Sequence, residues 1–178
     1  MKKLLVLYLL FIIAPVIAGV YGILHDQLTY TISPEYYTKF KFFQFGLADL
    51  GDEAIFPNPR LQVSIVGFLA TWWVGLPIGL ILGFVGMIHK NGKEMFRITM
   101  KALFLTLLIA FIAGLVGLAF GKFYLANHAT SWYLPENVMD KANYIAVGSM
   151  HNFSYLGGLI GLIVAVIFSV RKRNRLKD

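Results

Sequence analysis

The chain has 178 residues, of which 58% are hydrophobic and only 14% are charged, and its formal net charge is +7. A soluble globular domain is nearer to half apolar and a quarter charged, so this composition excludes an ordinary soluble domain and a disordered chain. The absence of cysteine excludes disulfides, thiolate metal sites and iron–sulfur clusters. The composition therefore indicates an integral membrane protein.

Four apolar stretches are long enough to cross a hydrocarbon core, which takes about 20 helical residues. The predicted spans cover residues 4–24, 61–88, 98–121 and 145–170, and none contains an acidic residue. Continuous apolar runs, rather than alternating ones, favour helices over a β-barrel. The sequence predicts an all-α membrane protein with a single transmembrane domain over residues 1–178, a four-transmembrane-helix bundle.

The first span also resembles a secretory signal peptide, because Lys2 and Lys3 precede an apolar run. The run continues to Leu24, which is long for the apolar part of a signal peptide. We therefore expect a retained helix, and the other three spans are predicted in the same way in either case.

Most of the 16 basic residues fall on one side of the predicted membrane, in the N-terminus, the loop 89–97 and the tail 171–178. The positive-inside rule places these segments in the cytoplasm, and the loops 25–60 and 122–144 outside it. We expect a multi-pass protein of the inner (cytoplasmic) membrane with both termini inside. The basic tail is explained as a topology anchor that attracts anionic lipid, and nucleic acid is not an expected partner because no reading domain is present.

Small residues recur at every fourth position of the second span, at Gly67, Thr71, Gly75, Gly79 and Gly83. Glycine pairs with the same spacing occur in the third and fourth spans, at Gly117 and Gly121 and at Gly157 and Gly161. Such ridges allow helices to approach closely in lipid. We expect them mainly to pack the bundle, while a leftover ridge would offer a surface to a homo-oligomer or another membrane partner.

An aromatic segment, residues 36–45 (YYTKFKFFQF), lies between the first two predicted helices. It is too short to span a membrane, and it contains Lys39 and Lys41. The preceding Ser33-Pro34-Glu35 is typical of a helix start, with a capping serine and a proline in the first turn. We expect an interfacial or re-entrant helix that Gly46 ends, preceded by a short β-like alternation over residues 28–32.

Polar groups gather near the outer ends of the first and fourth predicted helices. His25 and Asp26 follow the first span directly, whereas His151 lies inside the fourth span and shares a helix face with Tyr155. An ionisable residue within a span is a functional candidate. Because the two outer ends lie at similar depth in an antiparallel bundle, we expect these groups to meet near the outer surface, together with Glu35.

Two imidazoles and one or two carboxylates suit a divalent transition metal such as zinc, iron, manganese or copper. The expected metal ligands are His25, Glu35 and His151. The other expected ligand-binding residues are Asp26, Gln27, Asn152 and Tyr155, with Trp72 or Trp73 as an apolar floor. Haem is the weaker alternative as a cofactor, because His25 would be an axial ligand at a helix end.

Three functions remain open at this point. The first is a site for a metal ion or small polar ligand on the extracytoplasmic side. The second is a non-catalytic membrane subunit or scaffold whose polar cluster is structural, and the third is a small transporter of protons or solutes. The sequence does not decide whether the protein is an enzyme, since it contains no HExxH, no GxSxG and no phosphate-binding loop.

Four segments carry a resemblance to a known family: YGILHDQLT, SPEYYTKF, ATWWVG and HNFSYLGG. They resemble motifs of a family of small bacterial four-helix membrane proteins, and the resemblance runs from the first to the fourth predicted helix. It implies the same architecture and draws attention to His25, Glu35 and His151, but it implies no particular activity. Family members have a histidine–proline pair where this chain has Lys39-Phe40, so no ligand is expected there.

Overall fold

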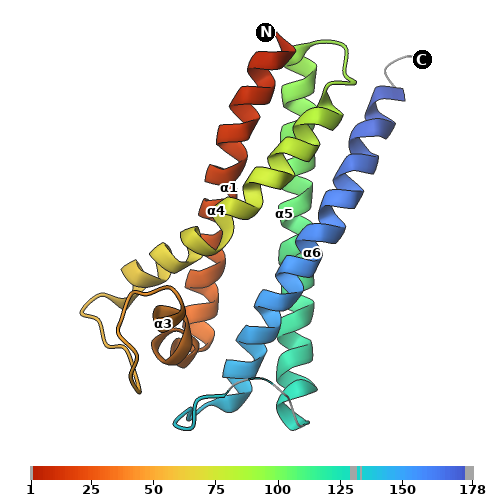
Figure 1. The fold of residues 1–178 in the computed structure, drawn as a ribbon. Helices are drawn as coiled ribbons and strands as arrows, with labels where there is room; N and C mark the ends of the chain where they lie inside the picture. The colour runs from red at the N-terminus through yellow and green to blue at the C-terminus, as the bar shows by residue number, and fades with distance from the viewer. Residues whose placement is uncertain (1, 129–131, 133, 175–178) are drawn as a thin grey trace.

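The structure is a computed structural model that describes residues 2–128, 132 and 134–174, and within that part helices joined by turns and loops are the only regular secondary structure (Figure 1). The long helices are α1 (Lys3–Ile32), α4 (Pro59–Gly86), α5 (Gly92–Phe123) and α6 (Lys141–Asn174). Each of these four is long and apolar enough to cross a membrane. The predicted four-helix, all-α bundle is confirmed.

The four long helices pack as two pairs, α1 with α4 and α5 with α6. The start of α1, the connection between α4 and α5, and the end of α6 lie at one end of the bundle (Figure 1). The segments assigned to the cytoplasm by their basic residues therefore share one end of the molecule. The aromatic segment and the connection between α5 and α6 lie at the opposite end.

The glycine ridges pack helices of the same chain. A Cβ on Gly67 of α4 would lie 2.7 Å from the carbonyl carbon of Gly22 on α1, and one on Gly75 would lie 2.6 Å from the Ala14 oxygen. In the second pair, a Cβ on Gly161 of α6 would lie 2.8 Å from the Thr106 oxygen of α5. Backbones approach this closely only because no side chain intervenes. Assembly with another chain stays a prediction.

The first helix is longer than predicted. It continues through residues 25–32, so the expected loop from residue 25 and the expected β-like alternation over 28–32 are both wrong. Thr29 and Thr31 donate their hydroxyls back to the carbonyls of His25 and Gln27, at 3.2 and 2.9 Å, which keeps these β-branched residues compatible with a helix. His25 and Asp26 consequently project from the last turns of a rigid helix.

The aromatic segment folds as three consecutive helical turns, α2 (Pro34–Tyr36), the π-helical η1 (Tyr37–Lys41) and α3 (Phe42–Gln44). It ends as predicted at Gly46, whose φ of 66° favours glycine. The predicted cap is wrong, since the Ser33 hydroxyl makes no capping bond. Tyr37 and Phe42 are buried in a cluster that also contains residues of α4 and α6. The segment therefore closes one end of the bundle.

Candidate functional site

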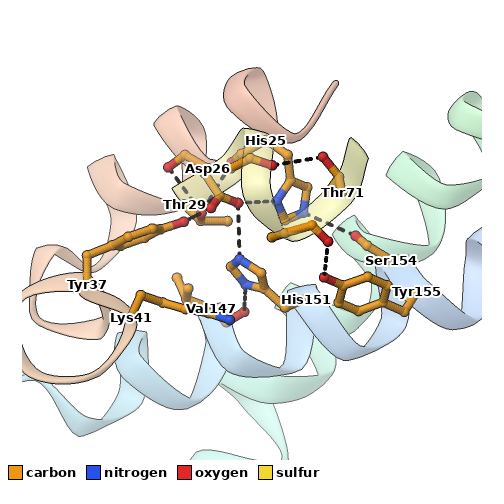
Figure 2. Close-up of polar contacts among 12 residues, drawn as sticks. His25, Asp26, Thr29, Tyr37, Lys41, Thr71, Val147, His151, Ser154 and Tyr155 are labelled. Carbon is orange, nitrogen blue, oxygen red and sulfur yellow. Dashed lines mark hydrogen bonds and ion pairs between the residues drawn. The ribbon is translucent and has the colours of Figure 1, made fainter. Parts of the chain in front are cut away.

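Three ionisable side chains meet inside the bundle, at the end closed by the aromatic segment. His25 and Asp26 come from α1 and His151 comes from α6 (Figure 2). They are 6%, 3% and 7% exposed, and one ligand atom of each lies within 4.8 Å of the others. The two imidazole rings stand edge to face with their centroids 4.9 Å apart. The expected approach of the two histidines is found, and this group could hold a metal ion.

A single carboxylate oxygen lies between the two rings. Asp26 Oδ1 is 3.2 Å from His25 Nδ1 and 3.2 Å from His151 Nε2. In a tetrahedral site with metal–ligand bonds near 2.0–2.1 Å, two ligand atoms are about 3.3 Å apart. The nitrogen-to-oxygen distances in this cluster therefore match those around a bound ion.

The outward-facing ring nitrogens also have partners. His151 Nδ1 lies 2.9 Å from the Val147 carbonyl oxygen, one turn earlier in α6, and His25 Nε2 lies 3.1 Å from the Ser154 hydroxyl. These contacts fix both rings with their other nitrogens turned toward Asp26 (Figure 2). Metal-binding histidines are commonly oriented in this way, by a hydrogen bond from the nitrogen that does not bind the ion.

The second carboxylate oxygen of Asp26, Oδ2, is buried and has no hydrogen-bond partner among the residues that the structure describes. Leaving a buried polar atom unpaired costs about 1–3 kcal/mol, and more for a charged group. The cluster thus holds a negative charge that its hydrogen bonds satisfy only in part.

The aromatic segment covers the cluster. The Tyr36 ring stacks on the His151 ring with centroids 5.2 Å apart, and the Tyr37 hydroxyl lies 2.6 Å from the Thr29 hydroxyl. Lys41 is also buried here, and its ammonium donates to Gln44 Oε1. Burial lowers the pKa of Lys41, while the negative charge of Asp26 opposes that shift. The cover excludes water and strengthens the electrostatic interactions beneath it.

Contrary to the prediction, the Glu35 carboxylate is not part of the cluster. It accepts hydrogen bonds from the Lys39 ammonium at 2.7 Å and from the backbone N–H groups of Met139 and Asp140, at 3.0 and 2.9 Å. These hydrogen bonds connect the start of the aromatic segment to the loop before α6. The Lys39 ammonium also donates to the Asn137 carbonyl of that loop.

Other expected site residues lie elsewhere. The Gln27 side chain bonds to Arg60 and Ser64 at the start of α4. Trp72 and Trp73 are 38% and 54% exposed, and neither lines the cavity beside the cluster, so they are not its floor. Asn152 is exposed and is likewise outside that lining.

Tyr155 is the remaining expected residue, and it does lie beside the cluster. It lines the adjoining cavity together with His25, Asp26 and His151, and its hydroxyl donates to the Ala70 carbonyl at 3.2 Å. The helix face shared by His151 and Tyr155 is therefore the face that α6 turns to the other helix pair.

The bonds of Glu35 predict a pH-dependent contribution to stability. Burial alone would raise the pKa of Glu35, but hydrogen bonds from the Asp140 N–H, the Lys39 ammonium and the Met139 N–H hold it below its ordinary value of 4.5. A carboxyl whose folded-state pKa is lowered stabilises the fold above its unfolded pKa and loses this effect as pH falls. We expect Glu35→Gln to destabilise the protein by about 1–2 kcal/mol at pH 7, with the difference shrinking as pH falls from about 4.5 through the lowered pKa of Glu35.

Thermal unfolding of the two proteins in detergent between about pH 2.5 and pH 7 measures this difference, because the range must extend below the folded-state pKa of Glu35. The matched control is Glu136→Gln, which removes an exposed carboxylate from the loop before α6. A Glu35→Gln effect that is constant across this pH range would contradict the assignment.

Sequence reasoning missed several residues that contact the cluster or its partners: Tyr21, whose ring centroid lies 5.8 Å from that of His25, and Thr29, Tyr37, Val147 and Ser154. Helical spacing would have indicated most of them. Tyr21 and Thr29 lie four residues before and after His25, and Val147 and Ser154 lie four before and three after His151. They share the faces of α1 and α6 that carry the histidines. Tyr37 has no such signal, because its position depends on the π-helical turn.

Two imidazoles and a carboxylate, all buried, can share one divalent ion or one proton. The hydrogen bonds described above, and not solvent, set the tautomers and charges of the two imidazoles.

In comparisons with models of protein families, with curated proteins and with solved structures, the chain matches none.

Proposed function

We propose that the protein is a membrane metalloprotein, in which His25, Asp26 and His151 bind one divalent transition-metal ion. The ion would be held inside the end of the bundle opposite the basic termini, which the positive-inside rule places on the extracytoplasmic side of the inner membrane. Three protein ligands leave at least one coordination position open, the arrangement typical of sites that also bind a small ligand.

The contact between His151 and Asp26 carries this proposal. The Val147 carbonyl can only accept a hydrogen bond, so the hydrogen of a neutral His151 lies on Nδ1. Nε2 then presents a lone pair to Asp26 Oδ1, which is also only an acceptor, at 3.2 Å. Two acceptors at this distance repel each other unless a cation lies between them. A metal ion bound to both atoms removes the repulsion and neutralises the buried charge.

The ligand set narrows the choice of ion. Two imidazoles with one carboxylate suit Zn²⁺, and the same set with open positions is typical of non-haem Fe²⁺. A haem iron is disfavoured, because the rings stand edge to face with centroids 4.9 Å apart, too close for the plane of a macrocycle to lie between them.

The contact between His151 and Asp26 also supports one alternative, in which a proton takes the place of the metal ion. A protonated His151 would then form a buried ion pair with Asp26, and the cluster would fix the packing of α1 against α6. This structural function needs no metal. Asp26 would then stabilise the fold as one partner of the ion pair and would not be a metal ligand.

Titration of the full-length, detergent-solubilised protein with Co²⁺ separates these two functions. We expect one Co²⁺ per chain, with visible absorption of the intensity typical of a four- or five-coordinate site. Asp26→Asn keeps the shape of the side chain but removes its charge and offers His151 a donor, and we expect it to weaken Co²⁺ binding by more than about 100-fold.

Asp140→Asn is the control, because the Asp140 carboxylate is exposed, lies outside the cluster and accepts hydrogen bonds from Asn143 in the first turn of α6. It should bind Co²⁺ as the parent does. Absence of stoichiometric Co²⁺ in the parent, combined with reduced stability of Asp26→Asn, would favour the structural ion pair instead.

A further inference from the structure

A cavity of about 350 Å³ adjoins the metal-site residues and extends between the two helix pairs. All four long helices contribute to its wall. At one end it contacts His25, Asp26, His151 and Ser154. From His151 it continues along α6 as far as Leu162, a distance of about three turns or roughly 16 Å. The cavity is thus elongated, with the ionisable cluster at one end.

Away from the cluster, the wall is apolar. Its side chains there include Val74, Ile78, Ile81, Leu107, Leu159 and Leu162. The hydroxyls of Thr71 and Thr106 already donate to backbone carbonyls, as does the Tyr155 hydroxyl. A polar ligand would find few hydrogen-bond partners along this wall, whereas an apolar chain has no hydrogen bonds to lose when it is buried there.

The cavity also reaches the outer surface of the bundle. Ile81, Tyr155 and Leu159 line it and yet remain 42%, 45% and 60% exposed. These residues belong to helices long and apolar enough to span a membrane, so in a bilayer their exposed faces would meet lipid. A ligand dissolved in the bilayer can therefore enter from the side.

From this combination we infer that the site takes a lipid-soluble ligand with one apolar chain and one oxygen-bearing end, such as a carboxylate or a carbonyl. The chain lies between the helix pairs, and the oxygen faces His25, Asp26 and His151. The position of the oxygen rests on the proposed metal site, because a metal ion there would bind it. The position of the chain rests only on the cavity.

Gly158 offers a direct way to block the chain. It lines the cavity, and a Cβ built on it meets no atom within 4 Å. We expect a Gly158→Phe side chain to start in this open space and to occupy the space of the ligand. Leu156→Phe is the matched control, since Leu156 is on the same helix, is 53% exposed and is outside the cavity lining.

The experiment uses the full-length protein in vesicles of dioleoylphosphatidylcholine. The probe is dodecanoic acid with a photoreactive diazirine near the end of its chain. We expect crosslinks at Ile81, Leu107 or Leu162 that an excess of plain dodecanoic acid suppresses. The yield should fall at least tenfold in Gly158→Phe and stay within twofold of the parent in Leu156→Phe. Equal labelling of both variants, or labelling only of lipid-facing residues such as Phe104 and none of the cavity residues, would overturn the inference.

A parallel measurement separates this inference from the proposed metal site. In Co²⁺-loaded protein, dodecanoic acid should change the visible spectrum of the parent, because its carboxylate binds the ion. Crosslinks in the cavity without any Co²⁺ binding would refute the metal site and leave the lipid cavity in place. Stoichiometric Co²⁺ without cavity crosslinks would refute only the lipid ligand.

Discussion

Replacing His25 and His151 together by alanine is expected to abolish metal binding. The parent should retain about one divalent ion per chain after dialysis, and the double variant should retain none, because a single buried carboxylate cannot hold the ion alone. The expected loss of affinity exceeds the 10- to 100-fold that is typical of changes to residues around a metal's direct ligands. Elemental analysis by mass spectrometry of detergent-purified protein measures it.

The double variant also leaves Asp26 buried without partners, which costs several kcal/mol of stability. A second variant, His151→Gln, keeps a hydrogen-bonding group beside Asp26 and should fold while losing the metal. The control is His128→Ala, since His128 is exposed and its ring stacks on Tyr124, far along the chain from the cluster. If the parent and His151→Gln retained the same amount of metal, His151 would not be a ligand.

The second large effect is expected at the crossing of α1 and α4. Gly67→Ala places a methyl group 2.7 Å from the carbonyl carbon of Gly22 and 2.9 Å from the backbone nitrogen of Ile23. Since backbone cannot move aside as a side chain can, the two helices must separate. We expect a loss of about 1–3 kcal/mol in stability, despite the better helix propensity of alanine. Thermal unfolding in detergent measures this loss.

Gly158→Ala is the matched control for this prediction, because its added methyl group meets no atom within 4 Å. It should leave the midpoint of unfolding unchanged or raise it slightly, as expected for alanine in a helix. Equal melting temperatures for Gly67→Ala and the parent would contradict the close crossing of α1 and α4. Such a result would also argue against the position given for His25, because Gly22 lies one turn before His25 on the same helix.

The four helices follow from the sequence because each long apolar run can satisfy its backbone in lipid only as a helix. The end of α1 does not follow in the same way. Hydropathy falls at His25, and Thr29 and Thr31 weaken the local preference for helix. The helix continues because their hydroxyls bond back to the preceding turn and because its polar face packs against α6 and the aromatic segment. Such contacts depend on the whole fold, so a local pattern does not reveal them.

The sequence predicts that His25, Asp26 and His151 lie at one site, but it assigns the metal-ligand carboxylate to Glu35, whereas the structure places Asp26 between the two rings. The similar depths of His25 and His151 in an antiparallel bundle are enough to place them together. Glu35 and Asp26 are both close to His25 in the sequence. Asp26 is the carboxylate beside the imidazoles because the backbone N–H groups of the loop before α6 bind Glu35. The apolar cavity is also beyond sequence reasoning, since it is formed by the side-chain packing of four helices together.

X-ray absorption at the edge of the bound metal identifies the atoms that coordinate the ion. The measurement uses full-length protein without an affinity tag, loaded with one equivalent of Zn²⁺ or Co²⁺. We expect two imidazole nitrogens at about 2.0–2.1 Å and oxygen at a similar distance, with one imidazole lost in His151→Gln. A protein that binds no ion, or an ion whose ligands include no imidazole, would contradict this expectation.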